Sequence, residues 1–552
     1  MKKAFALILT LAILLSLLAA CGQTASQTGD QTGDPSTEQT ARPGEQTAAQ
    51  KQYINTFIAT DPSTLDCARF LGIVDRVILY SLTEPLTRIE NGVVTGAGAE
   101  RWEVSEDGLI YTFHLRDNYW EDGQKVTAGD YAYALRRQAD PANAWSFASD
   151  FFSVVNFEAV FNGEADASSL GVAAEDDATL VITLSEPNPA FLSTVDIFPC
   201  RESDVEAGGD SYGSEAGTIL SCGPFKLDNW MHNSRLDFSK NELYWDADNV
   251  ALDRFTDFVI NDEGAQMASL ENGSIDYAAV VSQEYAAAFD QRDDLYELDL
   301  DLGRTVMVVF NCQDAVFANE KIRQAFSLAL DRDLLIEITN GGLGTPAYGL
   351  IPGACYVGDI NFRAAAPEPL KALAGSVSDL QALLIEGMEE AGLGSDPAAL
   401  TVTFLYSDTS AKGRTDAELY QQLWRDALGV EVKLDFSESA TASIRAGEYQ
   451  VGSVGWGSTY EPLFQLSRWS TGGQAFWVNE TYAALVADGS ASMDEAERLE
   501  KYRQAEEMLV TAAAIAPVYY NASRTYAYSY VTGIPTNPFD TTGMKTYSTA
   551  GR

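Results

Sequence analysis

The stretch at residues 451–473 carries the side chains best suited to contact a ligand. Its glycines let the backbone approach a bound molecule closely, and its aromatic rings offer flat apolar faces. Two charged side chains, Glu461 and Arg468, could meet opposite charges on such a molecule. Two interpretations stay open: the stretch is one wall of a binding cleft, or its aromatic rings pack beneath an ordinary loop. On the first interpretation, the candidate ligand-binding residues are Trp456, Gly457, Ser458, Thr459, Tyr460 and Glu461.

Patterns for catalysis or metal binding are weak throughout the chain. A histidine-based metal site or a Ser-His-Asp triad would depend on His114 or His232, and no flanking residues support either. The motifs of a serine–lysine hydrolase, a zinc protease and a phosphate-binding loop do not occur. Residues 246–249 lack the Gly and the terminal Glu that fix a calcium loop. We expect no catalytic residue, no metal and no cofactor, although 80 Asp and Glu leave a carboxylate-pair glycosidase open.

The N-terminus has the layout of a bacterial secretion signal. Lys2 and Lys3 form a short basic region, residues 4–20 are almost entirely apolar, and small residues precede Cys21. The apolar run is about as short as a bilayer span can be and no second anchor follows it, so we expect cleavage. The run Leu-Leu-Ala-Ala-Cys resembles the lipobox of bacterial lipoproteins, in which cleavage leaves a Cys that carries lipid. We predict a lipoprotein signal peptide at residues 1–20 and lipidation of Cys21; an ordinary signal peptide or an uncleaved anchor is the alternative.

Residues 21–50 are rich in Gln, Thr, Gly, Ser and Asp and have almost no large apolar residue. Such a segment cannot bury enough apolar surface to offset the entropy of ordering it. We expect a flexible linker between a lipid on Cys21 and a folded body that begins near residue 51. The expected location is the outer face of the cell membrane.

The chain is strongly acidic, with 36 Lys and Arg against 80 Asp and Glu and a formal net charge of −44. Such a field repels nucleic acid and anionic lipid headgroups, and it slightly favours cationic ligands. Five of the six cysteines follow Cys21; they are far apart and form no CxxC pair, which argues against a zinc knuckle. One or two disulfides are compatible with a location outside the cell, but the sequence does not give their pairing, and the odd number leaves at least one free thiol.

Strands and helices alternate through the body, which predicts α/β lobes, two to four domains in all. The clearest local signals are the alternating strand at 110–116, a hairpin turn at 90–92, and Thr127 as the N-cap of a helix over 131–138. Further helices are expected at 66–82, 264–272, 318–338, 379–391, 416–428 and 494–513. Further strands are expected at 53–59, 179–184, 255–260, 274–277, 305–310, 400–406, 430–436 and 515–520.

As an ordered set, these segments resemble the solute-binding proteins of peptide-type ABC importers, above all the oligopeptide-binding branch. Each piece is weak alone, but the pieces run in family order across nearly the whole body. They include Glu84-Pro85-Leu86, Trp102 to Gly108, Tyr111 to Arg116, Val126 to Asp130, Cys222-Gly223-Pro224-Phe225, Tyr244-Trp245, Ile322 to Ala325, Ala329 to Arg332, Val451 to Pro462 and Pro517 to Tyr520.

The resemblance implies an α/β fold, a two-lobed clamshell of the periplasmic-binding-protein type (type II, cluster C) with an extra β-rich domain. It implies a first lobe at 51–300 with the β-rich domain inserted at about 86–214, a second lobe at 301–524, and a return to the first lobe at 525–552. A peptide would be held between the lobes mainly through its backbone, and closure would present the loaded form to permease subunits of the importer. On this basis we expect a monomer without enzyme activity.

One position departs from the family pattern. In the peptide-binding branch, an Asp that receives the peptide's α-amino group usually precedes the residue equivalent to Tyr460, and here that position is Thr459. A neutral hydroxyl cannot replace a buried carboxylate opposite an ammonium group, and Glu461 could do so only if the loop were rearranged. An oligosaccharide or another small solute is therefore the alternative ligand, favoured if Trp456 and Trp469 stack on sugar rings. A surface lipoprotein hydrolase is the distant alternative.

Overall fold

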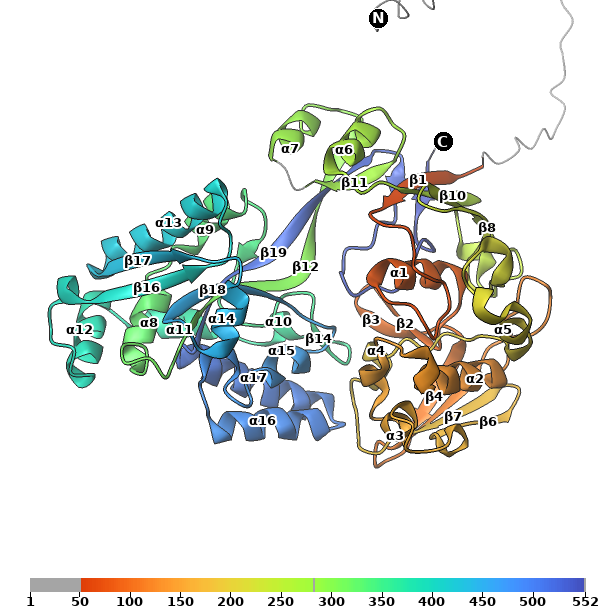
Figure 1. Cartoon of the computed structure of the whole chain (residues 1–552), viewed down its shortest axis with the longest axis horizontal. Helices are drawn as coiled ribbons and strands as arrows, with labels where there is room; N and C mark the ends of the chain where they lie inside the picture. The colour runs from red at the N-terminus through yellow and green to blue at the C-terminus, as the bar shows by residue number, and fades with distance from the viewer. Residues whose placement is uncertain (1–50, 281–282, 551–552) are drawn as a thin grey trace, which may run out of the picture. The chain divides into compact units, whose positions relative to one another are not determined.

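The computed structural model describes residues 51–280 and 283–550. The predicted signal peptide, Cys21 and the linker therefore lie outside the described residues. Residues 50–552 form one compact unit, in which two lobes are connected by long strands (Figure 1). Within the described ranges, every helix is too short or too polar to span a bilayer.

The first lobe is organised around a four-stranded sheet. In spatial order its strands are β1 (Tyr53–Ile58), β10 (Arg254–Val259), β9 (Arg235–Lys240) and β8 (Phe225–Met231). β1 and β10 run parallel, with Tyr53 opposite Arg254, although 200 residues lie between them in the sequence. Alternate side chains of the four strands enter one core, because successive residues of a strand point to opposite faces. That core also takes in Val531 and Tyr547 from the C-terminal segment.

A helix and two short strand pairs complete this part of the first lobe. They are α1 (Ile73–Leu82), the hairpin of β2 (Thr87–Glu90) and β3 (Val93–Gly96), and β20 (Val531–Thr532) with β21 (Ser548–Thr549). The hairpin predicted around residues 90–92 is confirmed, and its turn residues Asn91 and Gly92 have φ angles of 52° and 73°.

A second four-stranded sheet forms the β-rich part of the first lobe. In spatial order its strands are β4 (Ala99–Val104), β5 (Ile110–Leu115), β7 (Thr179–Thr183) and β6 (Val172–Asp176). The helices around it are α2 (Ala128–Ala139), α3 (Phe157–Phe161), α4 (Phe191–Thr194) and α5 (Glu202–Gly208). The predicted strand at 110–116 and the predicted cap are confirmed. Thr127 begins α2, and its backbone N–H donates to the Asp130 carboxylate at 2.8 Å.

Two long antiparallel strands run from one lobe to the other: β12 (Leu295–Phe310) and β19 (Ile515–Tyr528). The predicted strands at 305–310 and 515–520 are each one end of these longer strands. The predicted lobe boundaries after residues 300 and 524 both fall inside them, so the division of the chain stays a prediction. Beside them lie α6 (Glu263–Glu271), β11 (Tyr277–Val280) and α7 (Gln283–Phe289).

The second lobe wraps helices around both faces of the larger sheet. Beyond β11, β19 and β12, this sheet continues through β18 (Val451–Gly457), β16 (Thr401–Tyr406) and β17 (Glu431–Phe436). Along β12, Val308 and Phe310 enter one core while Met307 and Val309 enter the other, because the strand is buried on both faces. The short strands are β13 (Thr345–Pro346), β14 (Tyr356–Val357) and β15 (Ile360–Asn361). The helices are α8 (Glu320–Leu328), α9 (Arg332–Thr339), α10 (Phe362–Ala365), α11 (Pro369–Ser376), α12 (Leu380–Glu390), α13 (Ala411–Leu428), α14 (Ala440–Ala446), α15 (Leu463–Ser467), α16 (Glu480–Ala491) and α17 (Glu495–Thr511).

Three predicted elements differ from the structure. The helix predicted over 66–82 begins only at α1, because the Asp75 carboxylate accepts the Leu71 and Gly72 amides and caps that end. The helix predicted over 318–338 is two helices, α8 and α9, because the Asp331 carboxylate accepts the Leu334 amide and starts a new one. The strand predicted at 274–277 lies later, as β11.

The five cysteines of the described chain are free thiols. A hydrogen bond with Cys200, together with burial, raises the pKa of the Cys67 thiol.

Candidate ligand-binding site

The candidate residues lie on β18 and on the loop that follows it. β18 pairs antiparallel with β12 along its whole length, but it pairs with β16 only at Val451 and Gly452. The remaining part of that edge of β18 has no neighbouring strand in the described chain. A Cβ at Gly455 would lie 2.6 Å from the Arg304 Nη2, so a glycine there lets this guanidinium lie against the strand.

The end of β18 is fixed by the side chain of Gln465, which is buried on α15. Its Nε2 lies 3.1 Å from the Trp456 carbonyl oxygen, 3.0 Å from that of Gly457 and 3.0 Å from the Ser458 hydroxyl. The Ser458 amide donates to the Gly303 carbonyl of β12 at 2.6 Å. Gly457 remains exposed, so a short piece of ordered backbone faces solvent.

Trp456 is half-buried, and two arginines lie over its ring. The Arg468 guanidinium carbon lies 4.3 Å from the ring centroid, and that of Arg445 lies 5.9 Å away. The indole N–H donates to the Gln474 side-chain oxygen at 3.2 Å, which fixes the tilt of the ring. Trp469, by contrast, is almost fully buried in a core of the second lobe.

Tyr460 is buried where the two lobes meet. Its hydroxyl lies 3.0 Å from the Gly92 carbonyl oxygen of the β2–β3 turn and 2.7 Å from that of Gly358. Its ring stacks on Tyr356 at a centroid distance of 5.6 Å. A small hollow of about 250 Å³ beside this contact is lined by Asn91, Asp301, Gly353, Ala354, Tyr356, Thr536 and Asn537. Tyr460 thus links the first-lobe hairpin to the second lobe.

The side chains of Thr459 and Glu461 both interact with other groups of the chain. The Thr459 hydroxyl donates to the Glu461 carbonyl at 3.1 Å. Glu461 is buried, and its carboxylate accepts from the Arg498 guanidinium at 3.2 Å. Burial raises the pKa of Glu461, and the positive charge of Arg498 opposes that shift. The rearranged loop that would offer Glu461 to a ligand is not the one in this structure.

Sequence reasoning missed Arg445, Gln465 and Arg498, which reach the segment from α14, α15 and α17. No motif marks these three side chains, because their contacts with β18 and its loop exist only after the helices have packed.

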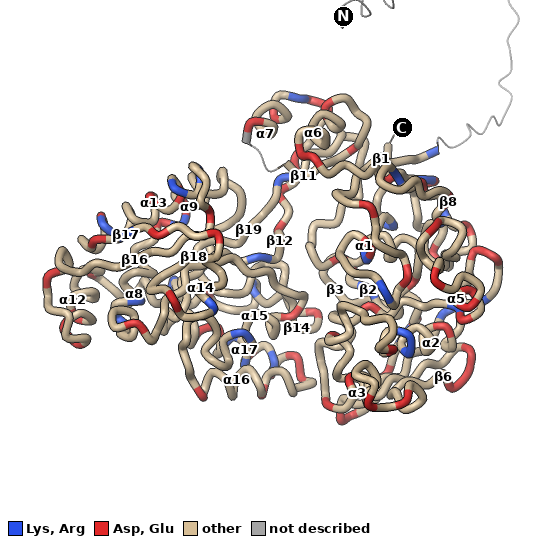
Figure 2. The backbone as a smooth tube through the Cα atoms, in the orientation of Figure 1, with Lys and Arg blue, Asp and Glu red and all other residues tan. Residues whose placement is uncertain are grey.

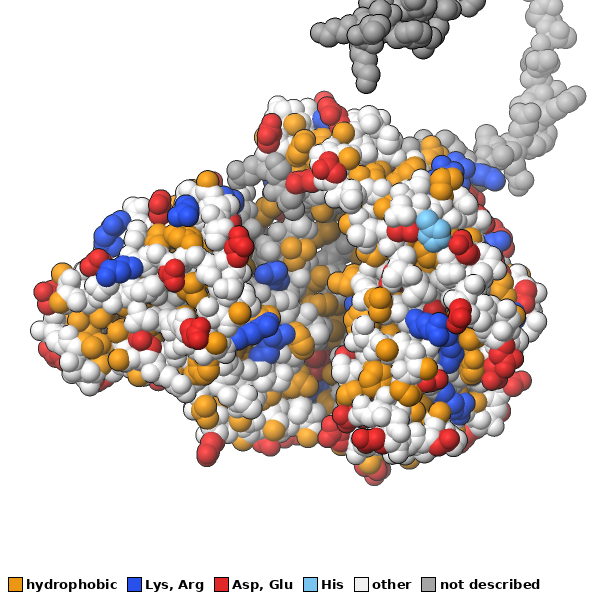
Figure 3. Space-filling view, viewed as in Figure 1, with side chains coloured by type: hydrophobic (Ala, Val, Ile, Leu, Met, Phe, Trp, Pro, Cys, Tyr) orange, Lys and Arg blue, Asp and Glu red, His pale blue; other side chains and the backbone are white. Residues whose placement is uncertain are grey.

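A deep hollow separates the two lobes of the 50–552 unit in the space-filling view, and apolar side chains line parts of its walls (Figure 3). Acidic residues are spread over both lobes (Figure 2). In the part of the chain that the structure describes, no group of His, Cys, Asp or Glu is placed to hold a metal ion.

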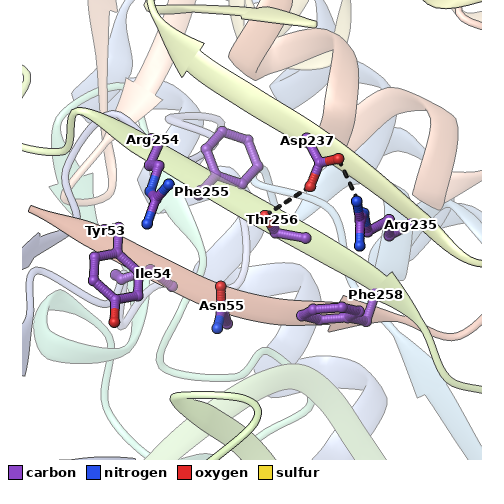
Figure 4. A pocket seen from close by; sticks show the side chains of 9 residues that line it. All are labelled: Tyr53, Ile54, Asn55, Arg235, Asp237, Arg254, Phe255, Thr256 and Phe258. Atoms are coloured by element: carbon purple, nitrogen blue, oxygen red, sulfur yellow. Dashed lines mark hydrogen bonds and ion pairs between the residues drawn. The ribbon is translucent and has the colours of Figure 1, made fainter. Parts of the chain in front are cut away.

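Another hollow, of about 390 Å³, lies on the first-lobe sheet formed by β1, β10 and β9 (Figure 4). Its charges are satisfied locally. Asp237 accepts from Arg235 and from the Thr256 hydroxyl, each at 3.0 Å, and Arg254 lies 4.8 Å from the Tyr53 ring centroid. This hollow shares no residue with the candidate segment on β18.

Comparisons with known proteins find relatives over most of the chain. The family model described as bacterial extracellular solute-binding proteins, family 5 (middle), matches residues 93–477. The dipeptide-binding protein DppE of Bacillus subtilis is 30% identical over 520 residues, covering 91% of this chain and 93% of DppE.

Two solved structures show the same fold. MppA, a periplasmic murein tripeptide-binding protein in its unliganded open form, matches with a TM-score of 0.80 and 28% identity, covering 91% of this chain and 98% of MppA. OppA of Haemophilus influenzae, in complex with the peptide RPPGFSPFR, matches with a TM-score of 0.61 and 26% identity, covering 91% and 99%. The predicted two-lobed α/β fold is therefore confirmed, and the chain belongs to the bacterial extracellular solute-binding proteins of family 5.

Proposed function

We propose that this protein is the lipid-anchored solute-binding component of an ABC importer, which captures oligopeptides between its lobes and delivers them to permease subunits. It acts as a monomer, needs no cofactor and carries out no reaction. The names of its relatives support the peptide ligand: DppE is a dipeptide-binding protein, and the OppA structure holds a nonapeptide.

The observation that carries the proposal is the open edge of β18 and the ordered backbone at Trp456, Gly457 and Ser458. An extended peptide binds by adding main-chain hydrogen bonds to a strand edge that no other strand occupies. Gln465 holds this backbone before a ligand arrives, so less ordering entropy is lost on binding.

The first lobe supplies apolar surface for ligand side chains. Leu71, Ile73 and Val77 are 61%, 69% and 49% exposed, an unusual concentration of bare large apolar side chains at one end of a helix. Contiguous exposed apolar surface of this kind marks binding sites more often than idle surface. We propose that these residues contact the side chains of the peptide when the lobes close.

The similarity to an open structure supports a clamshell whose lobes open and close. The match to the unliganded open MppA is closer than the match to the peptide complex of OppA, as the two TM-scores of 0.80 and 0.61 show. In the proposed cycle, bending of β12 and β19 brings the first lobe, residues 51–300 with 525–552, onto the second, residues 301–524.

A calorimetric titration tests the ligand class. Protein freed of bound molecules by mild unfolding and refolding is titrated with a mixture of tri- to pentapeptides, and separately with neutral oligosaccharides. We expect heat of binding in the titration, and a raised melting temperature in a thermal scan, with peptides alone. Binding of sugars without peptides would replace the proposal by its alternative, and turnover of either ligand would favour a hydrolase.

The variant Gln465→Ala tests the site itself. It releases the backbone at residues 456–458, and we expect peptide affinity to fall roughly tenfold. Gln421→Ala is the matched control, because that side chain also donates to a backbone carbonyl, that of Val432 on β17. Equal affinities for the two variants would place the ligand elsewhere.

The anchor is tested at Cys21. In the proposed form, the mature chain begins at Cys21 and carries acyl chains. We expect membrane-fraction protein with the mass of a lipidated chain, and Cys21→Ser should release unlipidated protein from that fraction. An unmodified, soluble wild-type chain would remove the lipid from the proposal and leave the ligand untouched.

A further inference from the structure

Two cysteines that lie far apart in the sequence meet inside the first lobe. Cys67 lies in a turn before α1, and Cys200 lies between α4 and α5. Both are buried in the first-lobe core, with exposed fractions of 3% and 0%. Both are thiols in this structure, and the two thiols are joined by a hydrogen bond. Their sulfur atoms are therefore direct neighbours.

Helix α2 holds the backbone of both cysteines. The Gln138 side chain donates to the Cys67 carbonyl at 3.2 Å, and it is itself fully buried. The Cys200 amide donates to the Asp130 carbonyl at 3.3 Å. One rigid helix thus positions two segments of the chain that are not otherwise close in sequence.

Arg137 of α2 also fixes the side chains around the two sulfur atoms. Its Nη1 lies 3.7 Å from the Cys200 Sγ, and its two Nη atoms donate to the Asp66 carboxylate at 2.7 Å each. Asp66 directly precedes Cys67 and is 1% exposed. A buried, bidentate pair of this kind allows little freedom of geometry. Cys67 can move away from Cys200 only if this pair is also broken.

The other three cysteines of the described chain are hydrogen-bonded to the backbone instead. The Cys222 thiol is bonded to the Glu84 backbone. In the second lobe, the Cys312 Sγ lies 3.7 Å from the Phe310 carbonyl oxygen, and the Cys355 Sγ lies 3.3 Å from that of Thr459. The contact between two thiols thus distinguishes one pair.

We propose that Cys67 and Cys200 form a disulfide once the protein is outside the cell, while Cys222, Cys312 and Cys355 stay reduced. The chain belongs to an extracellular family, and disulfides persist in oxidising environments. This proposal supplies the pairing that the sequence alone leaves open. It goes beyond the proposed function, and neither of the two tests below involves a ligand.

The bond forms by exchange with an external disulfide, RSSR. One cysteine thiolate attacks a sulfur of RSSR, forms a mixed disulfide and releases the first RS⁻. The second thiolate attacks the protein sulfur of that mixed disulfide and releases the other RS⁻. The two cysteines thereby give two electrons to RSSR, and their two protons end on two RSH molecules. Because both sulfur atoms are buried in the folded lobe, this exchange takes place during folding, before the core closes.

The disulfide would enclose a large part of the first lobe. It would close a loop of roughly 130 residues, and a cross-link over a loop of that length stabilises mainly by restricting the unfolded chain. All strands of the second four-stranded sheet, β4 to β7, lie within this loop, together with α1 to α4. We therefore expect the oxidised first lobe to resist unfolding better than the reduced one.

Peptide mapping of the full chain tests the pairing directly. Protein from the membrane fraction of a secreting host is denatured in iodoacetamide, which alkylates free thiols, and is digested without reductant. We expect a cross-linked peptide pair that contains Cys67 and Cys200, with Cys222, Cys312 and Cys355 alkylated. Alkylation of Cys67 and Cys200 to the same extent as Cys222 would overturn the proposal, and so would a different cross-linked pair.

Thermal unfolding with and without a phosphine reductant tests the consequence. We expect reduction to lower the melting temperature of the wild type by several degrees and to leave those of Cys67→Ala and Cys200→Ala unchanged. Cys222→Ala is the matched control, because Cys222 is buried in the same core, and it should keep the wild-type shift. Each protein is compared with itself, so a general loss of stability in a variant does not affect the comparison. Equal responses of all four proteins to the reductant would contradict the proposal.

Discussion

Asp257 places a carboxylate inside the first-lobe core, where it is 7% exposed on β10. Burial alone raises the pKa of this group from 3.8 to about 7. Its charge is felt by the hydroxyls of Tyr277 and Tyr547, and no hydrogen bond to its side chain is present in the described structure. A pKa raised by folding stabilises the folded state at low pH, and this stabilisation is lost as pH rises toward 7.

Asp257→Asn should therefore remove a pH-dependent penalty. The free energy of unfolding of the variant, minus that of the wild type, should rise between pH 4 and pH 7 by at most about 4 kcal/mol. Above pH 7 this difference should stay constant. Urea unfolding at a series of pH values measures the difference. Asp237→Asn on neighbouring β9 is the control, because hydrogen bonds from Asn229, Thr256 and Arg235 lower the pKa of Asp237, and its loss should destabilise the protein at neutral pH. Parallel pH curves for Asp257→Asn and wild type would contradict this account.

Arg498 and Glu461 make a buried ion pair, each with a side chain 3% exposed. Arg498→Met keeps the volume but leaves the Glu461 carboxylate buried without its counter-charge, so we expect a loss of about 3–5 kcal/mol in stability. Arg503→Met on the same helix is the control: its pairs with Glu500 and Glu507 are solvent-exposed and should be worth less than about 1 kcal/mol. Equal urea midpoints for the two variants would show that Glu461 gains little from Arg498.

Among the elements, β12 connects the lobes and also pairs with β18, which carries the start of the candidate segment. It carries a bulge between Asp301 and Arg304, and Gly303 within it has a φ of 59°. The Gly303 carbonyl accepts the Ser458 amide, so the bulge and the candidate site share a hydrogen bond.

Gly303→Ala tests this element. The new Cβ would lie 2.7 Å from the Phe539 ring in an unfavourable φ region, and we expect a loss of about 1–3 kcal/mol together with weaker peptide binding. Gly342→Ala is the control, because its φ of 78° is also positive but its Cβ would meet nothing closer than Glu337 at 3.6 Å. Its cost should be about 1 kcal/mol, with unchanged affinity. If both variants bind peptide like the wild type, the bulge does not support the site.

Elements with strong local signals could be predicted from the sequence. Strand β5 alternates apolar and polar residues, Thr127 caps α2, and Asn91-Gly92 makes a turn, and each signal acts over a few residues. The end of α8 at Leu328 could not be predicted in the same way, because the apolar face of α8 continues into α9. Only the N-cap at Asp331 separates the two helices. The parallel pairing of β1 with β10 is set by tertiary packing and leaves no local trace.

The candidate site was predictable to the same degree. Residues 456–461 are contiguous, and their glycines and aromatic rings mark them directly. The environment of the segment depends on three other helices, which bring Arg445, Gln465 and Arg498 to it. The sequence therefore singles out this segment, whose part in ligand binding stays a prediction. It does not indicate that Arg498 pairs with Glu461 or that two guanidinium groups lie over the Trp456 ring.

At the scale of the whole molecule, the long strands β12 and β19 connect the two lobes, and residues of the two lobes also meet directly. One such contact is the Tyr460 hydroxyl on Gly92, and Met493 lies close to Gly108 at another point. A ligand that binds both lobes would add interactions that exist only in the closed form, and it would shift the population toward that form. With a formal net charge of −44, copies of the chain repel one another.

Native mass spectrometry of the untagged mature body, purified gently from its expression host, tests the central claim most directly. The account predicts one protein molecule per particle with a ladder of co-purified masses, which fragment into peptide sequences. A protein that is empty as purified and shifts in mass only with sugars or another non-peptide solute would contradict the claim that its ligand is an oligopeptide.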